Sequence, residues 1–147
     1  MIRYTVNSIE TFLNIPSYVT ALTVTERSCN EKSIMVVDLS SFKCLRSVVI
    51  GNSCFKNVQV FSIVGLNWLE SVSIGRDSFR SDGSLLVGGQ FKIVNCPQLK
   101  SLSIGGESFG GYVGFELPQL PQLKSVVIAS SYCFEYTRNA VFRGMND

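Results

Sequence analysis

Apolar positions recur along this chain in a short pattern that is repeated four times. The four copies begin at Leu45, Leu69, Leu99 and Leu123, so the unit is about two dozen residues long, with one longer interval between the second and third copies. Counted from this leucine, positions 1, 4 and 6 are apolar, and positions 3 and 5 hold serine or valine. Alternation with a period of two predicts a strand that buries one face. A repeat that keeps its apolar positions predicts units that stack on one another.

The second half of each unit carries its own apolar pattern, at positions 17, 19 and 22. It predicts another short extended segment on the opposite wall, followed by a turn. The residues concerned are Val37, Leu39 and Phe42; Phe61, Ile63 and Leu66; Phe91, Ile93 and Cys96; and Phe115, Leu117 and Leu120. Position 11 is phenylalanine in all four units, at Phe55, Phe79, Phe109 and, after a one-residue insertion, Phe134. We expect these rings to stack into one buried row.

The limits of the repeat define the expected organisation of a single domain over residues 1–147. A divergent first copy spans 19–25, and about five repeats follow one another from 19 to 141. Residues 1–18 contain apolar side chains without the repeat pattern, so we expect them to cap the first unit. The carboxyl end is expected to be uncapped, covered by a partner or continued by further repeats. The longer interval places extra residues within 80–90, as a tolerated insertion or a binding loop.

This pattern resembles the leucine-rich repeat from Val19 onward. The resemblance implies a mainly β solenoid, a curved array with a parallel sheet on its concave side and short extended segments on the opposite wall. The family usually has asparagine or cysteine at position 9, where this chain has Ser53, Asp77, Glu107 and Ser131. We therefore expect serine, acidic or backbone groups to satisfy the turns at that position.

Charge and hydropathy narrow the function classes. The net charge is +2, from 13 basic and 11 acidic residues, which gives no basic field for nucleic acid. The chain has no apolar run long enough to cross a bilayer as a helix, which takes roughly 20 residues, so we expect no membrane span. Its amino terminus lacks a basic start and an apolar core, and from this we expect a cytoplasmic protein without a signal peptide.

Catalytic groups are scarce in this composition. The chain has no histidine, and its five cysteines form no C-x-x-C motif. We therefore expect no metal, no cofactor and no nucleophile activated by histidine. Three cysteines fall at repeat positions, which favours buried, reduced thiols. Asp77 and Glu107 would lie on stacked turns, yet nothing indicates a cleft around them. We expect a protein that is not an enzyme.

The candidate binding surface is the outward face of the main sheet, formed by positions 3 and 5 with a charged border at position 2. Its residues are Ser47, Val49, Ser71, Ser73, Ser101, Ser103, Ser125 and Val127, bordered by Arg46, Glu70, Lys100 and Lys124. Small side chains allow another backbone or a flat surface to approach closely. The resemblance to the leucine-rich repeat implies a non-catalytic protein-protein interaction module, which binds a protein partner through the concave sheet and the adjoining turns. An alternative is that the serines have no binding role, because serine is also common on exposed sheets as a residue that keeps them soluble. A different hypothesis is a structural, self-assembling fragment of a longer protein that associates through its open carboxyl end.

Overall fold

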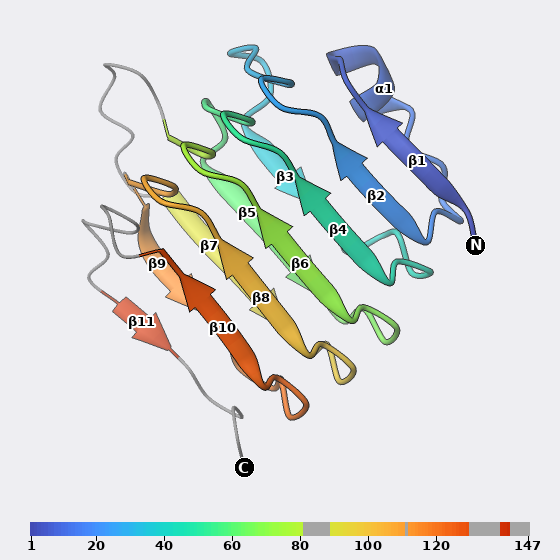
Figure 1. Ribbon diagram of the computed structural model, residues 1–147, viewed down its shortest axis with the longest axis vertical. Helices are drawn as coiled ribbons and strands as arrows, with labels where there is room; N and C mark the ends of the chain where they lie inside the picture. Colours follow the sequence, from blue (N-terminus) through green and yellow to red (C-terminus); the bar gives the residue numbers. More distant parts are fainter. Residues whose placement is uncertain (81–88, 111, 130–138, 142–147) are drawn as a thin grey trace.

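The computed structural model describes residues 1–80, 89–110, 112–129 and 139–141. These residues form mainly β structure, arranged as two layers of parallel strands (Figure 1). The helical part is α1 (Ile9–Leu13), near the amino terminus. The prediction of a mainly β chain, with a parallel sheet on one wall and extended segments on the other, is confirmed, and the extended segments form a second parallel sheet.

The front sheet of Figure 1 contains the repeated pattern. Its six strands have the order β1-β2-β4-β6-β8-β10. Their bounds are β1 (Arg3–Val6), β2 (Ala21–Val24), β4 (Ser47–Ile50), β6 (Ser71–Ile74), β8 (Ser101–Ile104) and β10 (Ser125–Ile128). Equivalent positions of successive copies pair directly, as in Ser47 with Ser71 and Ile50 with Ile74. The sequence repeat therefore sets the register of the sheet.

The back sheet contains the second apolar pattern of each unit. Its strand order is β11-β9-β7-β5-β3. The bounds are β3 (Val36–Asp38), β5 (Val60–Val64), β7 (Gly89–Val94), β9 (Tyr112–Glu116) and β11 (Asn139–Val141). From β2 to β11 the chain alternates between the two sheets. The register of β7 and β9 shifts between Gly89 and Gln90, next to the insertion in the repeat.

The core lies between the sheets and contains two columns of stacked phenylalanines. Ile74 and Ile104 are 2% and 1% exposed, which confirms the predicted burial of these two isoleucines at position 6. Phe79 stacks on Phe55 and Phe109, with ring centroids 5.4 and 4.6 Å apart. The predicted row is thus confirmed for these three rings, and Phe134 lies outside the described residues. A second column consists of Phe61, Phe91 and Phe115, with centroids 5.3 and 4.9 Å apart.

The expected cap, residues 1–18, includes a strand that the repeat pattern did not predict. β1 pairs in parallel with β2, so Tyr4 and Val6 take the places of the apolar positions 4 and 6. The short helix α1 begins with a capping box between Ser8 and Thr11. It carries Phe12, whose ring meets Phe55 edge-on at 5.5 Å.

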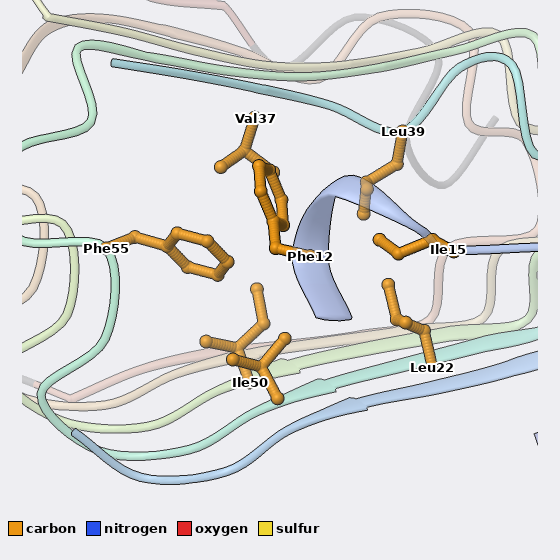
Figure 2. A pocket seen from close by; sticks show the side chains of 8 residues that line it. Phe12, Ile15, Leu22, Val37, Leu39, Ile50 and Phe55 are labelled. Carbon is orange, nitrogen blue, oxygen red and sulfur yellow. The ribbon is translucent and has the colours of Figure 1, made fainter. Parts of the chain in front are cut away.

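Figure 2 shows Phe12 between Val37 of the back sheet and Ile50 of the front sheet. The space around it is apolar and too small for a water molecule. Its lining is Phe12, Ile15, Leu22, Val24, Val37, Leu39, Ile50 and Phe55. The helix therefore fills the end of the core, and the space around Phe12 offers no ligand site.

Candidate functional site

The turns that follow the front strands hold the candidate surface in place. The N–H of Gly75 donates to the carbonyl of Ile50 at 2.7 Å, and Gly105 donates to Ile74 at 2.8 Å. A Cβ at Gly75 would lie only 2.7 Å from the backbone nitrogen of Asn52. Glycine at position 7 therefore lets adjacent turns approach closely, which keeps the strands before them in register.

Position 10, one residue after the expected polar position, carries the polar ladder of these turns. The Ser78 hydroxyl donates to the Gly51 carbonyl at 3.0 Å and accepts from the N–H of Cys54 at 3.2 Å. Ser108 repeats this arrangement with Gly75 and Ser78. Both serines are fully buried, so their hydroxyls satisfy backbone groups that lack access to water.

Position 9 contributes its backbone and a chain of polar contacts at the surface. Ser53, Asp77 and Glu107 all have φ near +60°, and the N–H of Asp77 donates to the Gly106 carbonyl. The Asp77 carboxylate accepts from the Ser53 hydroxyl at 3.2 Å and pairs with Lys56 at 3.4 Å. Serine, acidic or backbone groups were expected to satisfy these turns. In the described copies, backbone groups and the serines of position 10 do so, whereas the carboxylates of Asp77 and Glu107 bond to side chains.

The two stacked acids of position 9 are each held by cations. Glu107 pairs with Arg80 at 3.0 Å and with Arg76 at 3.5 Å. Asp77 pairs with Lys56, as described above. This arrangement differs from that of a general acid and base, in which two carboxyl groups flank a substrate.

The predicted outward face has two levels of exposure. Position 5 projects into solvent: Val49 is 44% exposed, Val127 is 57% exposed, and Ser73 and Ser103 are exposed. Position 3 is less exposed to solvent. Its side chains are half-buried in Ser47, Ser71 and Ser101, and only that of Ser125 is exposed. The pairing of Ser73 with Ser103 and of Ser71 with Ser101 brings each position into one column across the strands.

The charged border at position 2 precedes the strands and has two unlike halves. Arg46 pairs with Glu70 at 3.7 Å, and its guanidinium lies 5.8 Å from the ring centroid of Trp68. Lys100 and Lys124 are exposed and have no ion pair among the described residues. Trp68 is 56% exposed, and the repeat pattern does not predict it, because it precedes the leucine at a position that varies between copies. Its signal was that it is the only tryptophan in the chain.

The described cysteines are free thiols, and three of them are buried. Cys29, Cys54 and Cys96 pack in the core, while Cys44 is exposed. Burial raises the pKa of Cys29 to about 12 and raises the pKa of Cys54 and Cys96 as well. These three thiols are therefore poor nucleophiles at neutral pH. Cys133 lies outside the described residues.

Other candidate features give no second site. Within 1–80, 89–110 and 112–129, no group of three or more potential metal ligands occurs. In the described part of the chain, no helix is long and apolar enough to cross a membrane. Of the insertion, residues 81–88 lie outside the description. Comparisons with protein-family models, curated proteins and solved structures give no match.

Proposed function

We propose that the chain is a leucine-rich-repeat-like solenoid that acts as a non-catalytic protein-protein interaction module. The partner binds the outer face of the front sheet, which the resemblance places on the concave side, and the adjoining turns. The observation that carries the proposal is the alignment of small side chains at positions 3 and 5 in columns across successive strands. Such a surface presents hydroxyl groups and valines on a rigid backbone to an approaching protein surface.

The energetic advantage of this face is its preorganisation. Serine and valine lose little rotamer freedom on binding, whereas long flexible side chains cost more. The backbone beneath them is fixed by the in-register pairing of β6 and β8 and by the turn bonds of Gly75 and Gly105. Most of the conformational entropy of this face is therefore lost on folding rather than on binding. A partner can bind the face without rearranging it.

A non-catalytic role agrees with the chemistry available at the face. The serines lack a histidine base anywhere in the chain, and Asp77 and Glu107 are engaged with cations at the turns. The exposed residues Ser73 and Ser103 lie on the outer face of the front sheet, where they pair with each other in register. These features support binding of a protein partner better than catalysis.

The test replaces Ser73 and Ser103 with arginine, because position 5 is the more exposed column. The tagged chain is cross-linked in a lysate of its native cells, and captured proteins are quantified by mass spectrometry. The variant Ser73→Arg with Ser103→Arg should lose the proteins that wild type captures, while its free energy of unfolding changes by about 0.5 kcal/mol or less. Equal capture by this variant and wild type would exclude the front face.

A matched control places the same bulk and charge on the back sheet. Ser62 and Val94 lie in β5 and β7, and both are half-buried on the side away from the core. The variant Ser62→Arg with Val94→Arg should capture the same proteins as wild type. Loss of capture in both double variants would indicate a general effect of added charge.

One observation favours association of copies through the end of the front sheet as a second candidate function. Val126 and Ile128 of β10 are half-buried, whereas the equivalent Val72 and Ile74 of β6 are 1% and 2% exposed. β10 is also the last strand in the order of this sheet. Sedimentation velocity over a range of concentrations tests this alternative, which predicts a mass that rises with concentration. A constant monomer mass would contradict it.

A further inference from the structure

We propose that the half of the charged border at β8 and β10 is the docking site for an acidic segment of a protein partner. This inference rests on the function proposed above and assigns the chemistry of the partner at the same face. The residues that carry it are Lys100 and Lys124, together with Ser101, Ser103 and Ser125 on the strands that follow the two lysines. Carboxylates are the groups that this combination of cations and hydroxyl donors recognises.

The first step is that position 2 brings side chains of adjacent repeats within reach of one another. Arg46 and Glu70 occupy this position in successive units, and their charged groups are 3.7 Å apart. Lys100 and Lys124 occupy the same position in two later units. The N–H of Lys124 donates to the Lys100 carbonyl at 3.0 Å, so their backbones lie side by side.

The second step is that the two lysines lack an anion among the described residues. Glu70 lies between Arg46 and Lys100 in the column, and it forms its ion pair with Arg46. Neither lysine has an ion pair within the described residues, and both are exposed. Like charges at adjacent in-register positions repel each other, with strands about 4.8 Å apart. A carboxylate bound between or beside them removes this repulsion and adds two attractive contacts.

The third step concerns the surroundings. Ser101 and Ser125 follow the two lysines directly and pair with each other in register, and Ser103 lies exposed two residues along β8. Their hydroxyls are donors for the second oxygen of a carboxylate. In the other half of the border, Arg46 is already paired with Glu70, and its guanidinium lies 5.8 Å from the ring centroid of Trp68. The acidic segment is therefore directed to β8 and β10 rather than to β4 and β6.

A protein segment fits this site better than nucleic acid does. Two lysines neutralise few phosphates, and the net charge of +2 supplies no wider field. An extended peptide with closely spaced acidic side chains can place one carboxylate near each lysine. Its binding should weaken as salt is added, because both cations are exposed to screening.

The experiment is an NMR titration of the full chain with a peptide that alternates glutamate with serine. Wild type should show saturable amide shifts centred on residues 100–103 and 124–127, reduced at high salt. In the variant Lys100→Glu with Lys124→Glu, affinity should fall about tenfold or more. The same variant should gain binding to a peptide that alternates lysine with serine, a charge-swap rescue that a purely structural role of the lysines would not produce.

The matched control is Lys32→Glu with Lys92→Glu, which changes the net charge equally at exposed positions away from this border. It should bind the glutamate peptide as wild type does. Equal loss of affinity in both variants, shifts centred elsewhere, or tighter binding to phosphatidylserine vesicles would overturn the inference.

The two proposals can fail separately. One outcome is that the Ser73→Arg, Ser103→Arg variant loses partner capture while wild type shows no saturable titration with the glutamate peptide. This outcome would overturn only the proposal that an acidic segment binds at β8 and β10. Partner capture that survives those arginines would overturn the proposed function of the whole face.

Discussion

The hydroxyl of Tyr112 donates a 2.7 Å hydrogen bond to the carbonyl of Val58, 54 residues earlier in the chain. Tyr112 is fully buried, and its ring meets Phe79 and Phe109 edge-on at 6.4 and 4.8 Å. A Cβ at Gly89 would lie 2.7 Å from this ring, so glycine in β7 leaves the space that the tyrosine occupies. The bond links the repeat unit that begins at Leu45 to the unit that begins at Leu99. These two units are not consecutive in the sequence, because the unit that begins at Leu69 lies between them.

Replacing Tyr112 with phenylalanine should lower the free energy of unfolding by about 1–3 kcal/mol, because it leaves the Val58 carbonyl without its donor. Chemical denaturation measures this change. Tyr18→Phe is the control, since Tyr18 is 61% exposed and should change stability little. Equal effects of the two variants would contradict the importance of the buried bond.

Stability should fall as the solution becomes strongly alkaline. Burial raises the pKa of Tyr112 above its ordinary value of 10.0, so above that pH the unfolded chain releases a proton that the folded chain keeps. The stabilising contribution is complete below pH 10 and decreases above it, by up to about 1.4 kcal/mol per pH unit for one proton. Denaturation between pH 9 and 11 should show a shallower decline for Tyr112→Phe than for wild type. Parallel declines would contradict this assignment.

The Cys29 thiol adds a second alkaline contribution that begins at lower pH. Its pKa is raised to about 12 from 9.0, mainly by burial, so stability falls from pH 9 upward as the unfolded thiol ionises. Comparison of Cys29→Ala with wild type over the same pH range isolates this contribution. A stability difference between the two that does not vary with pH would contradict it.

Phe79 is the central ring of the first phenylalanine column and contacts both columns. Replacing it with alanine should cost about 3–5 kcal/mol, because it opens a cavity between Phe55, Phe109 and Phe61. Leu13→Ala, at a side chain that is 70% exposed, is the control and should cost about 0.5 kcal/mol or less. A loss below about 1 kcal/mol for Phe79→Ala would contradict a tightly packed column.

Ser78 should be replaceable by cysteine but not by alanine. Alanine removes the donor to Gly51 and the acceptor for Cys54 in a buried place, at a cost of about 1–3 kcal/mol. Cys54 occupies the same repeat position, and its thiol donates to the Thr25 carbonyl at 3.1 Å. Ser78→Cys should therefore lose less stability than Ser78→Ala in thermal or chemical unfolding. The reverse order would contradict a polar ladder at position 10.

The regular part of the fold could be predicted because the repeat encodes it more than once. Alternation around Ile74 and Ile104 indicated the buried face of the front sheet, and Phe61 and Phe91 indicated that of the back sheet. Each copy faces nearly the same neighbours, so one local pattern specifies the packing of them all. The sequence did not predict β1, because its segment has only two apolar residues, Tyr4 and Val6. It lacks the leucine and the glycine that identify the other copies of the repeat.

The sequence predicted which residues form the candidate surface, but only partly how exposed each of them is. Position 3 is less exposed to solvent than position 5, as in Ser71, which is half-buried, and Ser73, which is exposed. Trp68 beside Arg46 and the pairing of Arg46 with Glu70 depend on side chains from successive repeats, so no single copy contains them. The same holds for Lys100 and Lys124, which lie one full repeat apart in the sequence and side by side in the structure.

By itself, the sequence determined the strand-forming segments, their inward side chains and the glycine-marked turns, because each depends on alternation or backbone freedom within a few residues. Only the tertiary structure decided which residue carries the polar ladder, how α1 fills the end of the core and which border charges are neutralised. These features depend on distances between groups a full repeat or more apart. Such distances are fixed only when the sheets pair and the core closes, so they have no counterpart in a local pattern.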